Sequence, residues 1–97
     1  MLKAMICQPM AGLTREEILV NRDKIVERLS QVEVIDTFFD DVPNVGGENI
    51  GILLLAKSLE AMSKADIVIF ADGWQNARGC MIEYEVACAY DKPIIEL

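Results

Sequence analysis

The sequence contains no histidine, which limits the catalytic chemistry open to a single chain. Ser-His-Asp and Cys-His catalysis both use an imidazole as the base, so neither is available within one chain. An acid, base or nucleophile must then come from Asp, Glu, Cys, Tyr or Lys. Carboxylate chemistry is therefore the default expectation.

Cysteine is scarce and positive charge is in the minority. The three cysteines, Cys7, Cys80 and Cys88, are an odd number without a CxxC spacing, so the sequence predicts neither a disulfide framework nor a metal site. The net charge of −7 argues against nucleic acid as a partner, because that binding depends on Lys and Arg. Binding of a small anion is compatible with this net charge, since Arg15 or Arg78 near a helix N-terminus can hold one phosphate.

Long hydrophobic runs and cofactor motifs are also missing. No segment approaches the roughly 20 apolar residues of a membrane span, and the N-terminal apolar run is too short for a signal peptide. The glycines form neither a GxGxxG nor a P-loop, and no cofactor is expected. We therefore expect one cytoplasmic domain, residues 1–97, that does not bind membranes.

Apolar runs and helical periodicities alternate along the chain. Strands are predicted at 2–7, 33–37, 67–71 and 93–97. Helices are predicted from Thr14 to about Gln31, where Thr14 and Glu17 form a capping box, from about residue 50 to 63 with Asn49 as N-cap, and from near Arg78. Residues 38–48 hold a proline and two adjacent glycines, which indicates a binding or lid loop.

This alternation predicts an α/β fold with three layers and four parallel strands in the order 2-1-3-4, flavodoxin-like or Rossmann-like. Loops 8–13 and 72–78 then face each other across a crevice at the carboxyl edge of the sheet, where such folds bind ligands. The apolar residues of the helix at 50–62 cover more than one face. That pattern fits either an interface in a homo-oligomer or a deeply buried helix.

Glu83 is the first candidate for a catalytic residue. It lies about one turn into the third helix, beside a predicted sheet-facing stripe of Ile82, Val86, Ala89 and Tyr90. The positive end of the helix dipole favours its anion, which suits a nucleophile. A glutamate in a first turn is also common for the small stabilisation it gives, so spacing alone does not assign Glu83 a role.

Other candidates surround the predicted crevice. Asp72 follows the third strand and is expected either to orient a sugar hydroxyl or to form an ordinary turn. Trp74, the only tryptophan, either stacks on a planar ring of the ligand or caps the core. Asp40 and Asp41 either approach a ligand from their loop or remain solvated, and Cys80, near a helix N-terminus where a thiol pKa tends to fall, is a weaker candidate nucleophile.

The segment DGWQNARGCMIEYEVACAYDKPII resembles the end of the nucleoside 2-deoxyribosyltransferase-like superfamily, in particular its small phage and bacterial members. In that superfamily a glycine precedes the catalytic glutamate by four residues, and a small residue and a Lys-Pro pair follow. These positions are Gly79, Glu83, Ala87 and Lys92-Pro93. The N-terminal ICQPMAGLT, with Asn21-Arg22, is similar to the first strand of the family and the turn that lines its sugar pocket, so the resemblance covers nearly the whole chain.

The resemblance implies an enzyme of the N-glycosidic bond, either a deoxyribosyltransferase or an N-glycosidase. Glu83 would attack C1′ of a nucleoside or nucleotide and form a covalent glycosyl-enzyme, while Asp72 positions the sugar or the leaving base. The residues implied to bind the substrate are Gln8, Pro9, Met10, Gly73, Trp74, Arg78 and Gly79.

The chain differs from the family pattern at two positions and at its end. Gln8 replaces a glycine, Ala77 stands where the transferases carry an acidic residue, and Leu97 precedes the place of their C-terminal extension. Ala77 favours a second interpretation, a non-catalytic module that binds a nucleotide-like ligand or a protein, whereas Glu83 favours the enzyme. A third interpretation is a structural oligomer whose crevice is filled by side chains.

Overall fold

The computed structural model describes residues 1–37 and 50–97. Four strands form one parallel sheet in the order β2-β1-β3-β4, so the predicted α/β fold and strand order are confirmed. The strands are β1 (Leu2–Cys7), β2 (Val32–Val34), β3 (Ile67–Phe70) and β4 (Ile94–Glu96). The predicted loop at 38–48, with Asp40 and Asp41, and the predicted N-cap Asn49 lie outside the described residues.

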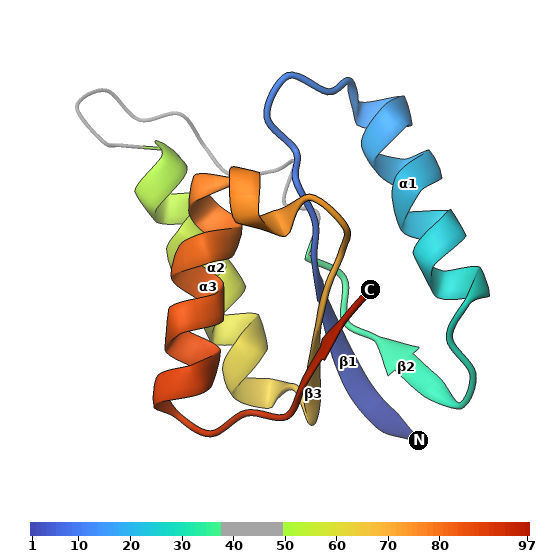
Figure 1. The fold of residues 1–97 in the computed structure, drawn as a ribbon, viewed down its shortest axis with the longest axis vertical. Helices are drawn as coiled ribbons and strands as arrows, with labels where there is room; N and C mark the ends of the chain where they lie inside the picture. The colour runs from blue at the N-terminus through green and yellow to red at the C-terminus, as the bar shows by residue number, and fades with distance from the viewer. Residues whose placement is uncertain (38–49) are drawn as a thin grey trace.

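Helices cover both faces of the sheet (Figure 1). They are α1 (Arg15–Glu27), α2 (Ile50–Lys64) and α3 (Arg78–Ala89), with a short 3-10 helix, η1 (Trp74–Asn76), before α3. Figure 1 shows α1 on one side of the sheet and α2 and α3 together on the other. This arrangement follows from right-handed crossovers, because the chain moves outward from β1 in one direction to β2 and in the opposite direction to β3 and β4.

Alternation along the central strands divides the core into two parts. On β1, Ala4 and Ile6 belong to the apolar cluster on the α1 face, whereas Met5 and Cys7 belong to the cluster on the face of α2 and α3. The side chains of β3 alternate between the two faces of the sheet in the same way. Most of the side chains of these two strands that belong to the core are less than 3% exposed. The residue after Cys7, Gln8, therefore points back to the α1 face.

Local signals locate the start of α1 correctly, but its end is earlier than predicted. The Glu17 backbone N–H donates to Thr14 Oγ1 at 3.2 Å, and the Thr14 N–H donates to Glu17 Oε1 at 3.0 Å, which confirms the capping box. The helix ends at Glu27 with Arg28 as its C-cap, and Gln31, in the turn before β2, adopts a left-handed conformation with φ of 60°.

The second, third and fourth strands are shorter than predicted, and each ends one or more residues early. In β2 the difference is largest. Asp36 and Thr37 leave the strand, and their side chains contact Arg22 of α1 instead of continuing the ladder.

Of the predicted sheet-facing stripe of α3, only Val86 packs against the core, and the other three residues are exposed. Ile82 is 38% exposed and Tyr90 is 79% exposed, while Cys80, Glu83 and Ala87 form the buried face. Cys80 and Ala87 are small, which lets α3 approach the core between β3 and α2 closely. Glu83 therefore lies inside the buried stripe and not beside it.

The helix predicted as an interface is partly covered in the single chain. Leu53, Leu54, Leu55 and Leu59 are half-buried, and Ile52 is exposed. Association through α2 stays a prediction.

Among the described residues, no helix has the length and apolar character required to cross a membrane.

Two glycines near the candidate site are expected to respond to alanine in opposite directions. Gly73 has φ of 87°, so Gly73→Ala should lower the free energy of unfolding by about 1–2 kcal/mol because a Cβ is disfavoured in that conformation. Gly79 lies in the first turn of α3, and no atom lies within 4 Å of a Cβ added there. Gly79→Ala should therefore raise the free energy of unfolding by about 0.5 kcal/mol. Urea unfolding of both variants measures the changes, and equal signs would contradict this account.

Candidate functional site

A groove lies at the carboxyl edge of the sheet, where the two loops were predicted to meet. Gln8, Pro9 and Leu13 from the first loop and Asp72 from the second line it. Its volume is about 360 Å³, which is within the range of small-molecule sites. The two loops thus do face a common space, and it opens on the α1 side of the sheet.

The other wall of the groove comes from α1, and of its polar residues only Asn21 was connected with a pocket in the sequence analysis. Asn21, Lys24 and Arg28 line it from successive turns of the helix. The available signal was their spacing of three and four residues, which places them on one face of a helix. The sequence does not show that this face meets the carboxyl ends of the strands.

The polar atoms of the Gln8 side chain form hydrogen bonds within the protein. Its Nε2 donates to the Ile18 carbonyl at 3.0 Å, and its Oε1 accepts from Arg22 Nε at 2.7 Å. Arg22 also donates from Nη2 to Thr37 Oγ1 at 2.9 Å. The Gln8 side chain therefore holds α1 against β1, and its role at the groove is to position the wall.

Arg22 is a buried cation with mostly neutral partners. Its side chain is 9% exposed, and the exposed Asp36 carboxylate is 3.9 Å from Nη1. Burial lowers the pKa of Arg22, and Asp36 opposes that shift. Arg22 therefore connects α1 with the ends of β1 and β2.

We expect Arg22→Ala to lower the free energy of unfolding by about 2–4 kcal/mol, because it leaves the buried oxygens of Gln8 and Thr37 without their donor. Urea unfolding measures the loss. Arg28→Ala removes the same side chain from an exposed position on the same helix and should change stability by less than about 0.5 kcal/mol. Equal losses in the two variants would show that the network around Arg22 adds nothing.

Glu83 lies on the opposite face of the sheet from the groove. Its side chain is 8% exposed, and its carboxylate accepts hydrogen bonds from the Cys7 thiol and the Ser58 hydroxyl. Cys7 ends β1 and Ser58 belongs to α2, so three elements meet at this carboxylate. Glu83 does not line the groove that Asp72 lines, and the two candidate catalytic residues are not brought together there.

The electrostatics of Glu83 differ from the expectation. Burial raises its pKa above the ordinary value, and the hydrogen bonds from Cys7 and Ser58 lower it by less. The sequence-based expectation was that the positive end of the helix dipole favours the ionised Glu83 carboxylate. It did not take into account the desolvation of that carboxylate on burial. Glu83 is therefore a carboxyl group that takes up a proton more readily than an exposed glutamate.

The same burial removes Cys80 as a candidate nucleophile. Its pKa is raised to about 12, first by burial and then by Glu83, so the expected fall near the helix N-terminus is wrong. Burial also raises the pKa of Cys7, and the neighbouring Glu83 adds to the shift. Both thiols stay protonated at neutral pH, and Cys7 acts as a hydrogen-bond donor to Glu83.

Trp74 is partly buried and packs on the core, which favours the second of its two predicted roles. Its ring stacks on Tyr84 with centroids 4.2 Å apart and planes 12° apart, and it contacts Phe70 at 5.4 Å. One face of the indole is therefore covered by protein.

The remaining predicted residues lie around the groove and at the start of α3. Asp72 is exposed at the groove, and a Cβ added at the next residue, Gly73, would lie 3.7 Å from Pro9 Cγ. Arg78 and Gly79 are exposed in the first turn of α3. Met10 is half-buried and does not line the groove.

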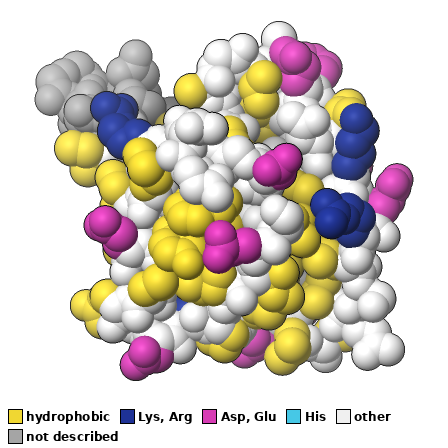
Figure 2. Space-filling view, viewed as in Figure 1, with side chains coloured by type: hydrophobic (Ala, Val, Ile, Leu, Met, Phe, Trp, Pro, Cys, Tyr) yellow, Lys and Arg dark blue, Asp and Glu magenta, His cyan; other side chains and the backbone are white. Residues whose placement is uncertain are grey.

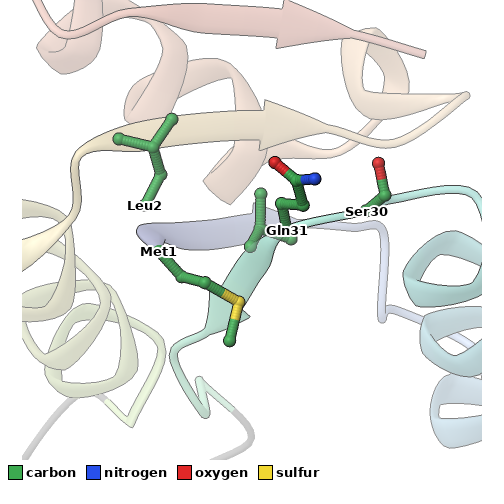
Figure 3. Close-up of a pocket in the computed structure, with 5 residues that line it drawn as sticks. Met1, Leu2, Ser30 and Gln31 are labelled. Carbon is green, nitrogen blue, oxygen red and sulfur yellow. The ribbon is translucent and has the colours of Figure 1, made fainter.

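A second hollow lies at the opposite edge of the sheet, by the start of β1 and β2. Met1, Leu2, Ser30 and Gln31 line it, and Figure 3 shows the Met1 and Leu2 side chains pointing away from each other. None of the described residues that line this hollow is acidic or basic. It offers no chemistry comparable with the groove.

The raised pKa of Glu83 predicts a specific dependence of stability on pH. Folding favours the protonated form, so this contribution to stability is full below the unfolded pKa and is lost as pH rises through the folded pKa. Glu83→Gln lacks that loss, so its stability relative to wild type should improve between about pH 4 and neutrality. Urea unfolding over this range measures the difference. The control is Glu85→Gln, an exposed glutamate on the same helix, and a relative change of the opposite sign for Glu83→Gln would contradict the burial argument.

Fold and site together define an α/β protein with a ligand-sized groove at the carboxyl edge of a parallel sheet and a buried carboxyl group on the other face. Among the described residues, no three His, Cys, Asp or Glu side chains form a group suited to a metal ion. Compared with protein-family models and with curated protein sequences, the chain matches neither.

Proposed function

We propose that this protein acts on the N-glycosidic bond of a 2′-deoxynucleoside or its nucleotide, with Glu83 as the nucleophile. The observation that supports this most is the setting of Glu83, a nearly buried carboxyl group bonded by two neutral donors at the end of β1. A buried titratable group with a shifted pKa at the strand ends of an α/β fold is typical of a functional site. The resemblance of Gly79, Glu83 and Lys92-Pro93 to the deoxyribosyltransferase-like pattern points to the same residue.

The reaction proceeds in two displacements at C1′ of the sugar. A carboxylate oxygen of Glu83 forms a bond to C1′ while the C1′–N bond breaks, and the departing base takes the electron pair and a proton from solvent water. Water or a second base then attacks C1′, gives up a proton to solvent, and releases the Glu83 carboxylate as the C1′–O bond breaks. Cys7 and Ser58 hold the carboxylate in place, and their hydrogen bonds favour the ionised form that the attack requires.

A second function, binding without catalysis, is favoured by a different observation. Asp72 lines the groove on the α1 face, while Glu83 is bonded on the face of α2 and α3. Ala77, at the N-cap of α3, provides no carboxylate to join them. In this alternative, the protein binds a nucleotide-like ligand or a protein partner.

A direct assay separates the two functions. The wild-type protein is incubated with each of the four deoxynucleosides and their monophosphates, with and without an acceptor base, and free base is followed by chromatography. Release or exchange of base from any substrate supports the enzyme. The absence of release from all of them would overturn the enzymatic proposal and leave the binding module.

A further inference from the structure

We propose that the groove on the α1 face binds the phosphate group of a small phosphorylated, polyhydroxylated compound. Lys24 and Arg28 hold the phosphate, and Asp72, across the groove, accepts a hydrogen bond from a hydroxyl of the same ligand. This site is independent of the chemistry proposed for Glu83, which lies on the other face of the sheet.

The two cations are placed together by the helix. Lys24 and Arg28 are four residues apart near the end of α1, so they lie on one face, and both line the groove. Figure 2 shows basic side chains at the right, over α1, with acidic side chains beside them, and further basic side chains at the upper left. In a chain of net charge −7, this wall is a local site of attraction for an anion.

Neither cation is neutralised by the described part of the chain. Among the described residues, Arg22 pairs with Asp36 and Lys64 pairs with Glu60, whereas Lys24 and Arg28 form no ion pair. Both side chains line the groove, and neither forms an ion pair with Asp72, which lines the same groove. An incoming anion therefore displaces no internal ion pair.

The wall that carries the cations is held in position. The capping box fixes the start of α1, and the network of Arg22, Gln8 and Thr37 ties its middle to the ends of β1 and β2. A site on such an element loses little conformational freedom when a ligand binds. This supports binding of a small ligand without reorganisation of the helix.

The size and chemistry of the groove select the ligand class. A volume of about 360 Å³ suits one small molecule, and the acidic surface elsewhere disfavours a polyanion such as nucleic acid. An arginine and a lysine together match the double charge and several oxygens of a phosphate monoester. The carboxyl oxygens of Asp72 can accept hydrogen bonds, which suits the hydroxyls of a sugar-like body.

An NMR titration of the full chain tests the proposal with three probes, namely inorganic phosphate, ribose 5-phosphate and ribose. Saturable shifts of the Asn21 to Arg28 amides are expected with both phosphates and not with ribose at the same concentrations. The double variant Lys24→Gln, Arg28→Gln should weaken binding of both phosphates at least about tenfold. Asp72→Asn should weaken ribose 5-phosphate and leave inorganic phosphate unchanged.

Lys64→Gln, which removes an exposed lysine from α2, is the control for a general effect of charge. It should bind both phosphates as wild type does. The proposal is overturned if no phosphate probe gives saturable shifts, if the double variant binds as wild type does, or if Lys64→Gln weakens binding equally. Base release in the glycosidic assay has no bearing on these outcomes, so failure of one proposal is distinguishable from failure of the other.

Discussion

Replacing Glu83 with glutamine is expected to lower the rate of base release by at least about 1,000-fold, which corresponds to about 4 kcal/mol of activation free energy. Glutamine keeps the shape of the side chain and can accept hydrogen bonds from Cys7 and Ser58, so the surrounding packing is preserved. It cannot form the acyl-type ester bond to C1′ that a carboxylate forms. The loss should therefore appear in the chemical step, measured as release of base under single-turnover conditions.

Two measurements make this prediction specific. Glu85→Gln removes a carboxylate from an exposed position two residues along α3 and should leave the rate within about twofold of wild type. Mass spectrometry of the quenched wild-type reaction should detect the chain with one added deoxyribosyl group, which should be missing from Glu83→Gln. Base release that persists in Glu83→Gln, or a deoxyribosyl adduct on another residue, would assign the nucleophile elsewhere.

Replacing Phe70 with alanine is expected to lower the free energy of unfolding by about 3–5 kcal/mol. Phe70 ends β3, is fully buried and is one of the largest side chains in the core. Its ring contacts Tyr84 edge-on at 5.1 Å and Trp74 at 5.4 Å, so alanine leaves a cavity and removes both aromatic contacts. A small domain with a total stability of about 5–15 kcal/mol loses a large share of it.

Urea unfolding followed by Trp74 fluorescence measures the loss, and circular dichroism provides a second probe that does not depend on the indole environment. Tyr90→Ala is the matched control, because it truncates an aromatic side chain that is largely exposed, and it should change stability by less than about 0.5 kcal/mol. Phe70→Leu should recover part of the loss, since it keeps more of the volume. A cost below about 1 kcal/mol for Phe70→Ala would show that the core relaxes around this position.

Much of the fold is readable from the sequence because its signals are local. The apolar run of β1 and the capping box of Thr14 and Glu17 locate elements without reference to distant residues. The alternation of strands and helices, with right-handed crossovers, then leads to the strand order β2-β1-β3-β4. Strand ends are less well predicted, since Asp36 and Thr37 leave β2 for contacts with Arg22, a residue 14 or 15 positions earlier in the chain.

The candidate site is predictable only in part. The groove between the loops after β1 and β3 follows from the topology, and Asp72 and Pro9 line it as expected. Lys24 and Arg28 were missed because their spacing shows only that they share a face of α1, and the orientation of that face depends on how the helix packs. The engagement of Gln8 by Arg22 and Ile18 likewise depends on contacts between separate elements.

By itself, the sequence determined the elements, their order and the edge of the sheet at which ligands are expected, because periodicity, capping and crossover handedness operate over short segments. Only the tertiary structure decided what Cys7 and Gln8, adjacent in the chain, contact on opposite faces of the sheet. Cys7 packs in the core on the face of α2 and α3, and Gln8 accepts a hydrogen bond from Arg22 of α1. The tertiary structure also decided that Glu83 belongs to the buried stripe of α3, where removal from water raises its pKa. The physical reason is that burial and desolvation are sums over all neighbours of a side chain, and most of those neighbours are distant in the sequence.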